Sequence, residues 1–365
     1  MLASLKHFAD LDLLSVFSSQ RQLLGLDIGS SSIKLVQMKE HRGRYTLQKF
    51  AVKELEPEVI VDGTVMDEGR VVTAIKELLT ENNIKLKQVA ISISGHAVII
   101  KKISLPPMPD EELDSQVRLA AEQYIPFDIN EVNLDFYVLP PSENPEEQGE
   151  MSIVLVAAKK DKINELTELV KAAGLLPVVM DVDAFAIENM YGATAPGSDE
   201  DIATLVNIGA SVMNVNIVKG GVSLFTRDIP LGGNRYSEAV QRELGVSFEE
   251  AEQLKRGEPE SGDPLSAVME SVNAEVASEI ARTIDYFKTT SSDGEITRVL
   301  LCGGGAKIKG LSQQLRDRMH VEVEIANPFS EVDISQCQVD QDFLAEMGPI
   351  AAVGVGLALR TVGDR

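Results

Sequence analysis

Residues 23–38 read Leu-Leu-Gly-Leu-Asp-Ile-Gly-Ser-Ser-Ser-Ile-Lys-Leu-Val-Gln-Met, two apolar runs on either side of a small-residue turn. This pattern predicts a strand, a tight turn from Gly29 to Ser32 and a second strand. Glycine and serine leave the backbone N–H groups of the turn uncovered, so the turn is a candidate nest for phosphate oxygens. Lys34 can add a cation to the nest, and Asp27 is placed to hold Mg²⁺, usually through water. Taken alone, the stretch is also compatible with an ordinary Gly-Ser hairpin.

The same pattern occurs again in the second half of the chain. Residues 204–218 read Thr-Leu-Val-Asn-Ile-Gly-Ala-Ser-Val-Met-Asn-Val-Asn-Ile-Val, so Asn207-Ile-Gly-Ala-Ser211 corresponds to Asp27-Ile-Gly-Ser-Ser31. A third apolar segment follows each copy, at 45–52 and at 222–229. Internal repetition is a strong indicator of fold. It predicts two similar halves, each beginning with a three-stranded meander, that clamp a nucleotide between their turns.

These paired turns resemble the phosphate hairpins of the actin, Hsp70 and sugar-kinase superfamily. The resemblance implies an α/β chain with the actin-like ATPase fold, in which duplicated RNase H-like halves hold ATP and Mg²⁺ in the cleft between them. It extends to the glycine turn Ile229-Pro-Leu-Gly-Gly233, to the short helix expected at 247–256, and to the triple glycine of Cys302-Gly-Gly-Gly-Ala-Lys307. Three glycines at a strand end let a flat base lie directly on the backbone.

The resemblance assigns the nucleotide contacts to small and polar residues of these motifs. They are Gly29, Ser30, Ser31, Ser32, Lys34, Asn207, Gly209, Ala210, Ser211, Gly232, Gly233, Glu252, Lys255, Gly303, Gly304, Gly305 and Lys307. By position, Glu252 and Lys255 are the acidic residue and the lysine that border the adenosine in the family. Without the resemblance, the two are equally typical of a solvated charged face, which pairs at this spacing commonly form.

The second hairpin departs from the pattern of relatives that hydrolyse ATP. Where they have an aspartate and further polar residues, this chain has Asn207, Ala210 and Met213. Asparagine can hydrogen-bond but cannot accept a proton as a base. Asp27 and Asp183 are the catalytic candidates, although Asp183 or its neighbour Asp181 can instead cap the following helix. We expect nucleotide binding with slow or absent turnover, and a phosphotransferase of the same superfamily is the less favoured alternative.

The composition excludes several classes of protein. With 57 acidic and 34 basic side chains in 365 residues, the net charge of −23 repels nucleic-acid phosphates and anionic lipid headgroups, so no nucleic-acid partner is expected. The two cysteines, Cys302 and Cys337, show no metal-ligand spacing and favour a reducing cytoplasm. The apolar content of 44% supports substantial cores, and no apolar run approaches the roughly 20 residues that cross a bilayer. We expect a soluble protein of at least two domains.

The expected elements divide the chain into two halves and an insertion. The first half covers 21–97 and 176–200, and the second covers 201–365, whose final small-residue helix is expected to pack near the hinge. Residues 98–175 predict strand, helix, strand, strand, helix, an inserted α+β module with an acidic loop at 140–150.

The first 20 residues lie outside this plan. Their apolar side chains surround a helix instead of forming one stripe, which predicts a loosely held segment that packs on the body or on a partner. Asp10 and Asp12 disfavour a membrane-surface helix.

The insertion indicates which family within the superfamily the chain resembles. A strand-helix-strand-strand (SHS2-type, 1C-like) unit in the first half resembles the cell-division protein FtsA and its relative PilM of the type IV pilus machine. The segment Ala120-Ala-Glu-Gln-Tyr-Ile-Pro-Phe127 is similar to a signature that the two share. FtsA normally ends in a linker and a basic amphipathic helix, whereas this chain ends just after the apolar stretch 350–359. From Leu23 onward the chain is identified as a member of the PilM family, and an FtsA-like division scaffold is the alternative.

Membership of the PilM family implies partners. In that family the cytoplasmic N-terminal tail of the bitopic membrane protein PilN lies in a groove between the first subdomain and the inserted module. The resemblance implies the same here, with 89–98 and 113–124 lining the groove. It also implies a cytoplasmic protein, peripheral to the inner membrane through its partners, that helps to couple other pilus platform and motor proteins. Lateral self-association, which FtsA shows, is left open.

Overall fold

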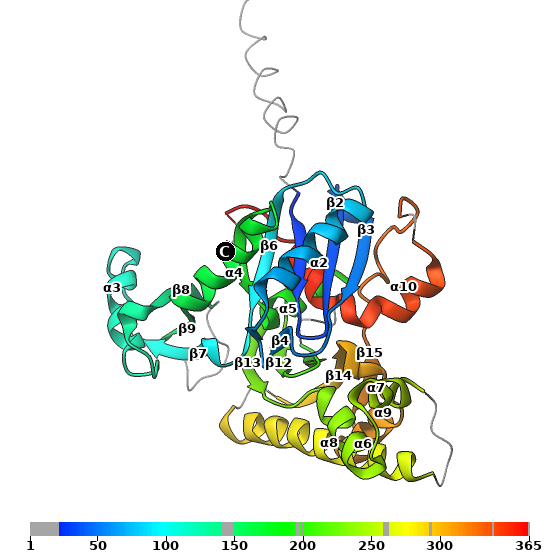
Figure 1. Cartoon of the computed structure of the whole chain (residues 1–365). Helices are drawn as coiled ribbons and strands as arrows, with labels where there is room; N and C mark the ends of the chain where they lie inside the picture. Colours follow the sequence, from blue (N-terminus) through cyan, green and yellow to red (C-terminus); the bar gives the residue numbers. More distant parts are fainter. Residues whose placement is uncertain are drawn as a thin grey trace, which may run out of the picture.

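The computed structural model describes residues 22–139, 149–194, 198, 200–257, 263–291, 294–337 and 339–363. The segment expected at 1–20 and most of the acidic loop expected at 140–150 lie outside these residues. Two five-stranded sheets form the body, and a three-stranded sheet extends to one side (Figure 1). Across the described residues, every helix is too short or too polar to cross a bilayer.

The first half is built on a mixed sheet with the strand order β10-β6-β1-β2-β3. Its strands are β1 (Leu24–Ile28), β2 (Ser32–His41), β3 (Arg44–Glu54), β6 (Gln88–Ile93) and β10 (Leu176–Val182). The first three form the antiparallel meander that the apolar runs predict, and β6 and β10 continue the sheet in parallel. A small hairpin of β4 (Ile60–Val61) and β5 (Thr64–Val65) leads into α2 (Glu68–Glu81), whose apolar stripe is buried on the sheet.

The second half repeats this plan with the order β13-β12-β11-β14-β15. Its strands are β11 (Ile202–Ile208), β12 (Met213–Lys219), β13 (Val222–Ile229), β14 (Ile296–Cys302) and β15 (Glu322–Ile325). As in the first half, the first three strands are antiparallel and the last two run parallel to the central strand. The duplicated halves confirm the actin-like ATPase fold predicted from the repeated turns.

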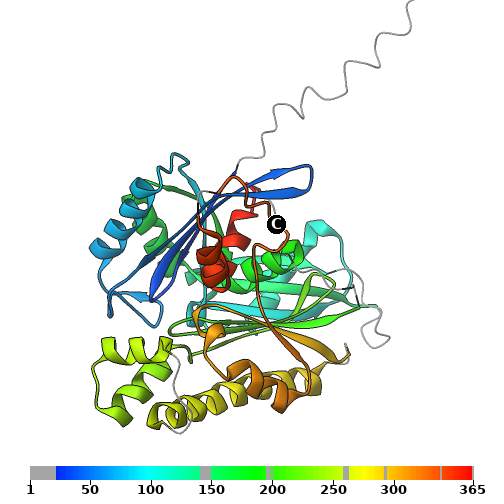
Figure 2. The same cartoon turned by 90° about the vertical axis from the view of Figure 1, so that its right-hand side faces the viewer.

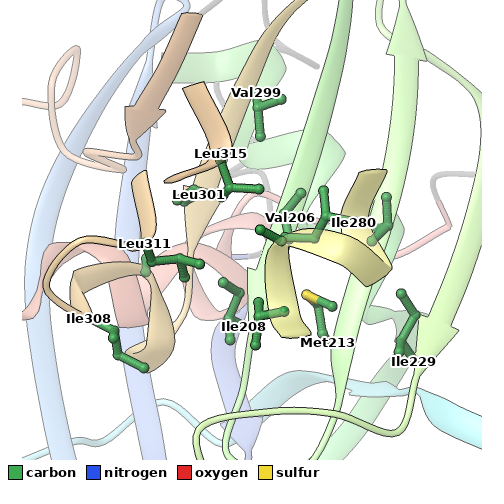
Figure 3. Close-up of a cluster of buried hydrophobic side chains, with 14 of the residues drawn as sticks. Val206, Ile208, Met213, Ile229, Ile280, Val299, Leu301, Ile308, Leu311 and Leu315 are labelled. Atoms are coloured by element: carbon green, nitrogen blue, oxygen red, sulfur yellow. The ribbon is translucent and has the colours of Figure 1, made fainter. Parts of the chain in front are cut away.

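Helices bury the apolar face of the second sheet. They are α6 (Asn234–Leu244), α7 (Phe248–Arg256), α8 (Pro264–Thr290) and α9 (Leu311–Met319), with the short 3-10 turn η3 (Gly304–Lys307) before α9. In Figure 3, Val206, Ile208 and Met213 of the hairpin strands meet Ile280 of α8 and Leu311 and Leu315 of α9. This core fixes the ends of β11 and β14, where the second hairpin and the triple glycine begin.

The inserted module is the strand-helix-strand-strand unit that the sequence predicts. It consists of η1 (Gly95–Ala97), β7 (Val98–Leu105), α3 (Asp110–Ala121), η2 (Ile129–Glu131), β8 (Val132–Val138), β9 (Met151–Lys159) and α4 (Lys160–Ala172). Its antiparallel sheet has the order β7-β9-β8, and α3 covers one face at the end far from the body (Figure 1). Helix α4 instead packs into the core of the first half through Leu166, Leu169 and Val170.

The two halves meet along a shared apolar layer. Helix α5 (Asp183–Thr194) links them, and η4 (Gly348–Ala351) and α11 (Ala352–Ala358) return to the same layer. Helix α10 (Gln341–Met347) precedes them and lies beyond β3 at the side of the first sheet (Figure 1), while α11 is drawn in red in Figure 2. Ala186, Leu205, Leu300 and Val353 belong to one buried cluster from both halves. A Cβ on Gly356 would lie 1.6 Å from the Ala186 carbonyl oxygen, so only glycine allows this approach of α11 to α5.

Candidate nucleotide site

The two predicted hairpin turns have matching backbone geometry. The N–H of Gly29 donates to the carbonyl of Ser32 at 3.1 Å, and the N–H of Gly209 donates to the carbonyl of Val212 at 3.0 Å. Each turn follows the central strand of its sheet, β1 or β11. The structure therefore places the two candidate phosphate nests at equivalent positions in the two halves.

Asp27 and Lys34 lie opposite each other on β1 and β2, and Lys34 Nζ is 3.2 Å from Asp27 Oδ2. Only 12% of the Lys34 side chain and 13% of the Asp27 side chain are exposed, so water screens this ion pair weakly. The same ammonium lies over the first turn, because a Cβ on Gly29 would come within 3.0 Å of it. Lys34 thus reaches the nest, as the sequence predicts. It also forms an ion pair with Asp27, the candidate metal ligand, and the sequence had not indicated this pairing.

The second hairpin carries a relay of polar side chains. Asn207 Nδ2 donates to Asn214 Oδ1 at 3.0 Å, and Asn214 Nδ2 donates to Asp228 Oδ1 at 2.7 Å. Oδ2 of Asp228 accepts the N–H of Gly95 from the first half at 2.5 Å. Sequence reasoning missed Asp228, although the meander places it directly opposite Asn214 and a register count could have found it. The second half therefore does contribute a carboxylate near its hairpin.

The predicted glycine turn closes over the second hairpin. The N–H groups of Gly233 and Asn234 donate to the carbonyls of Gly209 and Ala210, both at 2.8 Å. A Cβ on Gly232 would lie 2.5 Å from the Ala210 oxygen, so a larger residue would separate the two loops. The turn and the hairpin form one continuous small-residue surface.

Lys255 and Glu252 of α7 border this surface. Lys255 Nζ donates to the Gly233 carbonyl at 3.2 Å and to Ser237 Oγ at 3.0 Å, and it pairs with Glu252. The Ser237 hydroxyl also donates to Glu252. Burial lowers the pKa of Lys255, and the charge of Glu252 opposes that shift. The pair is therefore partly buried beside the glycine turn and is not a fully solvated helix face.

The triple glycine lies against the end of β11. Gly303 has a φ of +81°, and a Cβ there would lie 2.5 Å from both Asn207 Oδ1 and the Ile208 carbonyl oxygen. Gly305 packs on Ile208 just as closely, while Gly304 is exposed. Lys307 is exposed as well, and its ammonium donates to the carbonyl of Glu346 at 3.0 Å. Gly303 and Gly305 thus pack on the second hairpin, whereas the Lys307 side chain reaches the end of α10.

Asp183 begins α5 between the two halves. Burial, and then the nearby charge of Asp27, raise the pKa of Asp183 to about 6, and the charge of Asp228 adds to this. The charges that raise the pKa of Asp183 thus come from both halves, one from β1 and one from β13. Asp181 differs, because its side chain is 5% exposed and is held by Arg360 at 3.0 Å. Of the two aspartates considered, Asp183 is the one that faces the site.

The chemistry of this donor set fits Mg²⁺ held through water. The charges of Asp27 and Asp228 both disfavour the ionised form of Asp183, and a nearby cation would relieve this repulsion. Among the residues that the structure describes, no three His, Cys, Asp or Glu side chains are close enough to hold a metal ion directly. Mg²⁺ needs no such cage, because it keeps several waters and binds through one or two carboxylates together with substrate phosphates.

The family described as type IV pilus assembly protein PilM matches residues 25–362. The chain belongs to that family. A solved structure, the PilM-PilN type IV pilus biogenesis complex, is similar with a TM-score of 0.84 and 31% identity, over 94% of this chain and 100% of that chain. This protein is therefore an actin-like protein of type IV pilus assembly, as the sequence predicts.

Two more distant relatives share the fold. The cell division protein FtsA of Streptococcus pneumoniae serotype 2 (strain D39 / NCTC 7466) is 23% identical over 277 residues, which are 70% of this chain and 60% of FtsA. The matched region thus spans less than two thirds of that protein. MreB5 of Spiroplasma citri, in a structure bound to ADP, has a TM-score of 0.50 and 13% identity over 92% of this chain and 94% of that chain. The PilM family match favours pilus assembly over the division scaffold.

Proposed function

We propose that this chain binds ATP and Mg²⁺ between its two hairpins and acts as a nucleotide-dependent assembly protein of the type IV pilus platform. The proposal rests on the two matching turns after β1 and β11, with the Lys34 ammonium over the first turn and the hydrogen bond from Gly95 to Asp228 linking the second half to the first. The turns and Lys34 offer N–H groups and a cation to phosphates, and the Glu252–Lys255 pair and the triple glycine border the base. MreB5, which shares the fold, is bound to ADP in its solved structure, and this agrees with a nucleotide as the ligand.

In this proposal ATP turnover is slow because Asn207 cannot act as a base. A single Asn207→Asp change would direct a carboxylate at Asn214 Oδ1, so the relay must be changed with it. In the double variant Asn207→Asp/Asp228→Asn, the Asn214 side chain can turn over, so that its NH₂ donates to the new carboxylate at position 207 and its Oδ1 accepts from the new amide at position 228. The oxygen of that amide can still accept the N–H of Gly95, so every donor keeps an acceptor. We expect single-turnover hydrolysis by this double variant to exceed that of the parent roughly tenfold or more, since a positioned base contributes about 10²-fold or more. Parent turnover near the typical enzyme rate of roughly 10 per second would contradict the account.

We further propose that the partner is the N-terminal cytoplasmic tail of PilN, which tethers this protein at the inner membrane and connects it to other platform and motor proteins. The similar PilM-PilN complex supports this choice. We expected residues 89–98 to line the groove. For the first residues of this segment the prediction is wrong. Val89, Ala90 and Ile91 are at most 1% exposed because β6 lies inside the first sheet.

The face of the module sheet opposite α3 is the better surface for the tail. Near the body it packs on the first half through Ile100 and Val156. Beyond them, Val154 is 8% exposed and belongs neither to the core of the first half nor to the core under α3. There Val154 lies between Lys102 and Tyr137 on the neighbouring strands. Tyr137 is 54% exposed, and exposed tyrosines are frequent anchors in protein interfaces. An extended peptide can lie along this strip beside α4.

Point variants test this surface better than removal of the module. Deleting the module would take Leu166, Leu169 and Val170 of α4 out of the first core. We expect Tyr137→Ala to weaken binding of the cognate PilN tail peptide about thirtyfold, the effect of a hot spot of about 2 kcal/mol. Leu119→Ala is the matched control, because Leu119 is 60% exposed on α3. Calorimetric titration that shows weaker binding for Leu119→Ala and unchanged binding for Tyr137→Ala would move the site to α3.

A further inference from the structure

Asp228 occupies an unusual position in the hydrogen-bonded relay. It lies on β13, two strands away from the hairpin strand β11, and it is not part of any phosphate motif found in the sequence. Its two carboxylate oxygens are nevertheless both used, one by Asn214 within the second half and one by Gly95 of the first half. Through these two bonds Asp228 joins the polar relay of the second hairpin to the first half.

The charge of Asp228 determines the direction of every bond in the relay. A carboxylate only accepts, so Asn214 must present its amide NH₂ to Asp228 and its Oδ1 to Asn207. Asn207 must then donate through Nδ2, which leaves its Oδ1 beside Gly303 in the candidate site. The neutral Asn207 therefore presents an oxygen acceptor there, the kind of atom that an aspartate would present.

We propose that Asp228 is a positioning residue that sets the orientation of Asn207 and ties the second hairpin to the root of the inserted module. This inference rests on the proposed nucleotide site. Gly95 lies in η1, three residues before β7 begins, and β13 also packs against β7. One carboxylate thus sets which atom of Asn207 would be offered to Mg²⁺-bound water, and it holds the first turn of the module against the second half.

Moving the carboxylate from position 228 to position 214 tests whether the charge of Asp228 sets the orientation of Asn207. In Asp228→Asn the side chain can no longer accept from both Asn214 and Gly95, so one bond is lost or both asparagine amides reverse. In Asn214→Asp/Asp228→Asn the charge moves one strand, all three donors regain acceptors, and Asn207 keeps its orientation. Glu200→Gln is the charge control, because Glu200 pairs with Lys219 elsewhere in the second half.

The first readout is the gain in ATP affinity on adding Mg²⁺, measured by calorimetry on the full chain. We expect Asp228→Asn to reduce this gain about tenfold, and the exchanged double variant and Glu200→Gln to retain it. A parent-like gain in Asp228→Asn, a loss in Glu200→Gln, or failure of the double variant to restore the gain would each overturn the inference.

The second readout needs no nucleotide. Hydrogen exchange of the Gly95 amide should accelerate about tenfold in Asp228→Ala, because the acceptor of that N–H is removed. Unchanged exchange would overturn the link to the module. If the parent chain binds no ATP, the proposed nucleotide function fails, and so does the role of Asp228 in orienting Asn207 for it. Accelerated exchange at Gly95 in Asp228→Ala would still establish the hydrogen bond from Gly95 to Asp228 between the two halves.

Discussion

Replacing Gly356 by valine is expected to lower the free energy of unfolding by more than roughly 4 kcal/mol. Effects of this size are exceptional, and severe overpacking of a core is one of their causes. Even the first added carbon would lie 1.6 Å from the Ala186 carbonyl oxygen and 2.4 Å from its carbon, and both atoms belong to backbone. Because backbone atoms cannot rotate away, the clash can be relieved only if α11 and α5 move apart. Because this contact belongs to the layer shared by both halves, we expect loss of the cooperative unfolding transition.

Gly192→Val is the matched control for this prediction. Gly192 lies in α5, the same helix that Gly356 approaches, but a Cβ there meets no atom within 4 Å. We expect its free energy of unfolding, measured by urea denaturation, to stay within about 1 kcal/mol of the parent. A Gly356→Val protein as stable as Gly192→Val would show that α11 does not pack on α5 as described.

Lys34→Ala is expected to weaken ATP binding roughly 10- to 150-fold, equivalent to about 1.5–3 kcal/mol for a charge-assisted contact. Lys34 is 12% exposed and lies over the Gly29 turn, so a phosphate bound there would meet a cation that water screens only weakly. Its ion pair with Asp27 does not compete with this role, because an ammonium has three donors.

Lys39→Ala removes the same charge from the same strand, at an exposed position beyond the turn. Calorimetric titration of ATP should give nearly parent affinity for this control. Equal weakening by both variants would mean that Lys34 acts only through the net charge of the chain, and the phosphate role of the first hairpin would be rejected.

Local sequence pattern was sufficient to predict the duplicated fold. The apolar runs around Asp27 and Asn207 define two meanders, and the small residues between them define two turns of equal geometry. The strand-helix-strand-strand order of the insertion was equally visible, because each element has its own periodicity and its own stop. Such features depend on neighbours within a few residues, which the sequence shows directly.

The parts that sequence reasoning missed depend on pairings between distant segments. The bond from Gly95 to Asp228 joins residues 133 positions apart, and the Arg360–Asp181 ion pair joins the chain end to the middle. Neither has a local pattern. The error over residues 89–93 has the same origin, because an apolar run does not show whether a strand lies at the edge or in the centre of a sheet.

The central claim is that one ATP binds with Mg²⁺ between the two hairpins. The most direct measurement is isothermal titration of the full folded chain with ATP in the presence of Mg²⁺. The account predicts saturable binding of one nucleotide per chain that weakens when Mg²⁺ is withdrawn. Absence of any binding heat at several temperatures, with the chain shown to be folded, would contradict it.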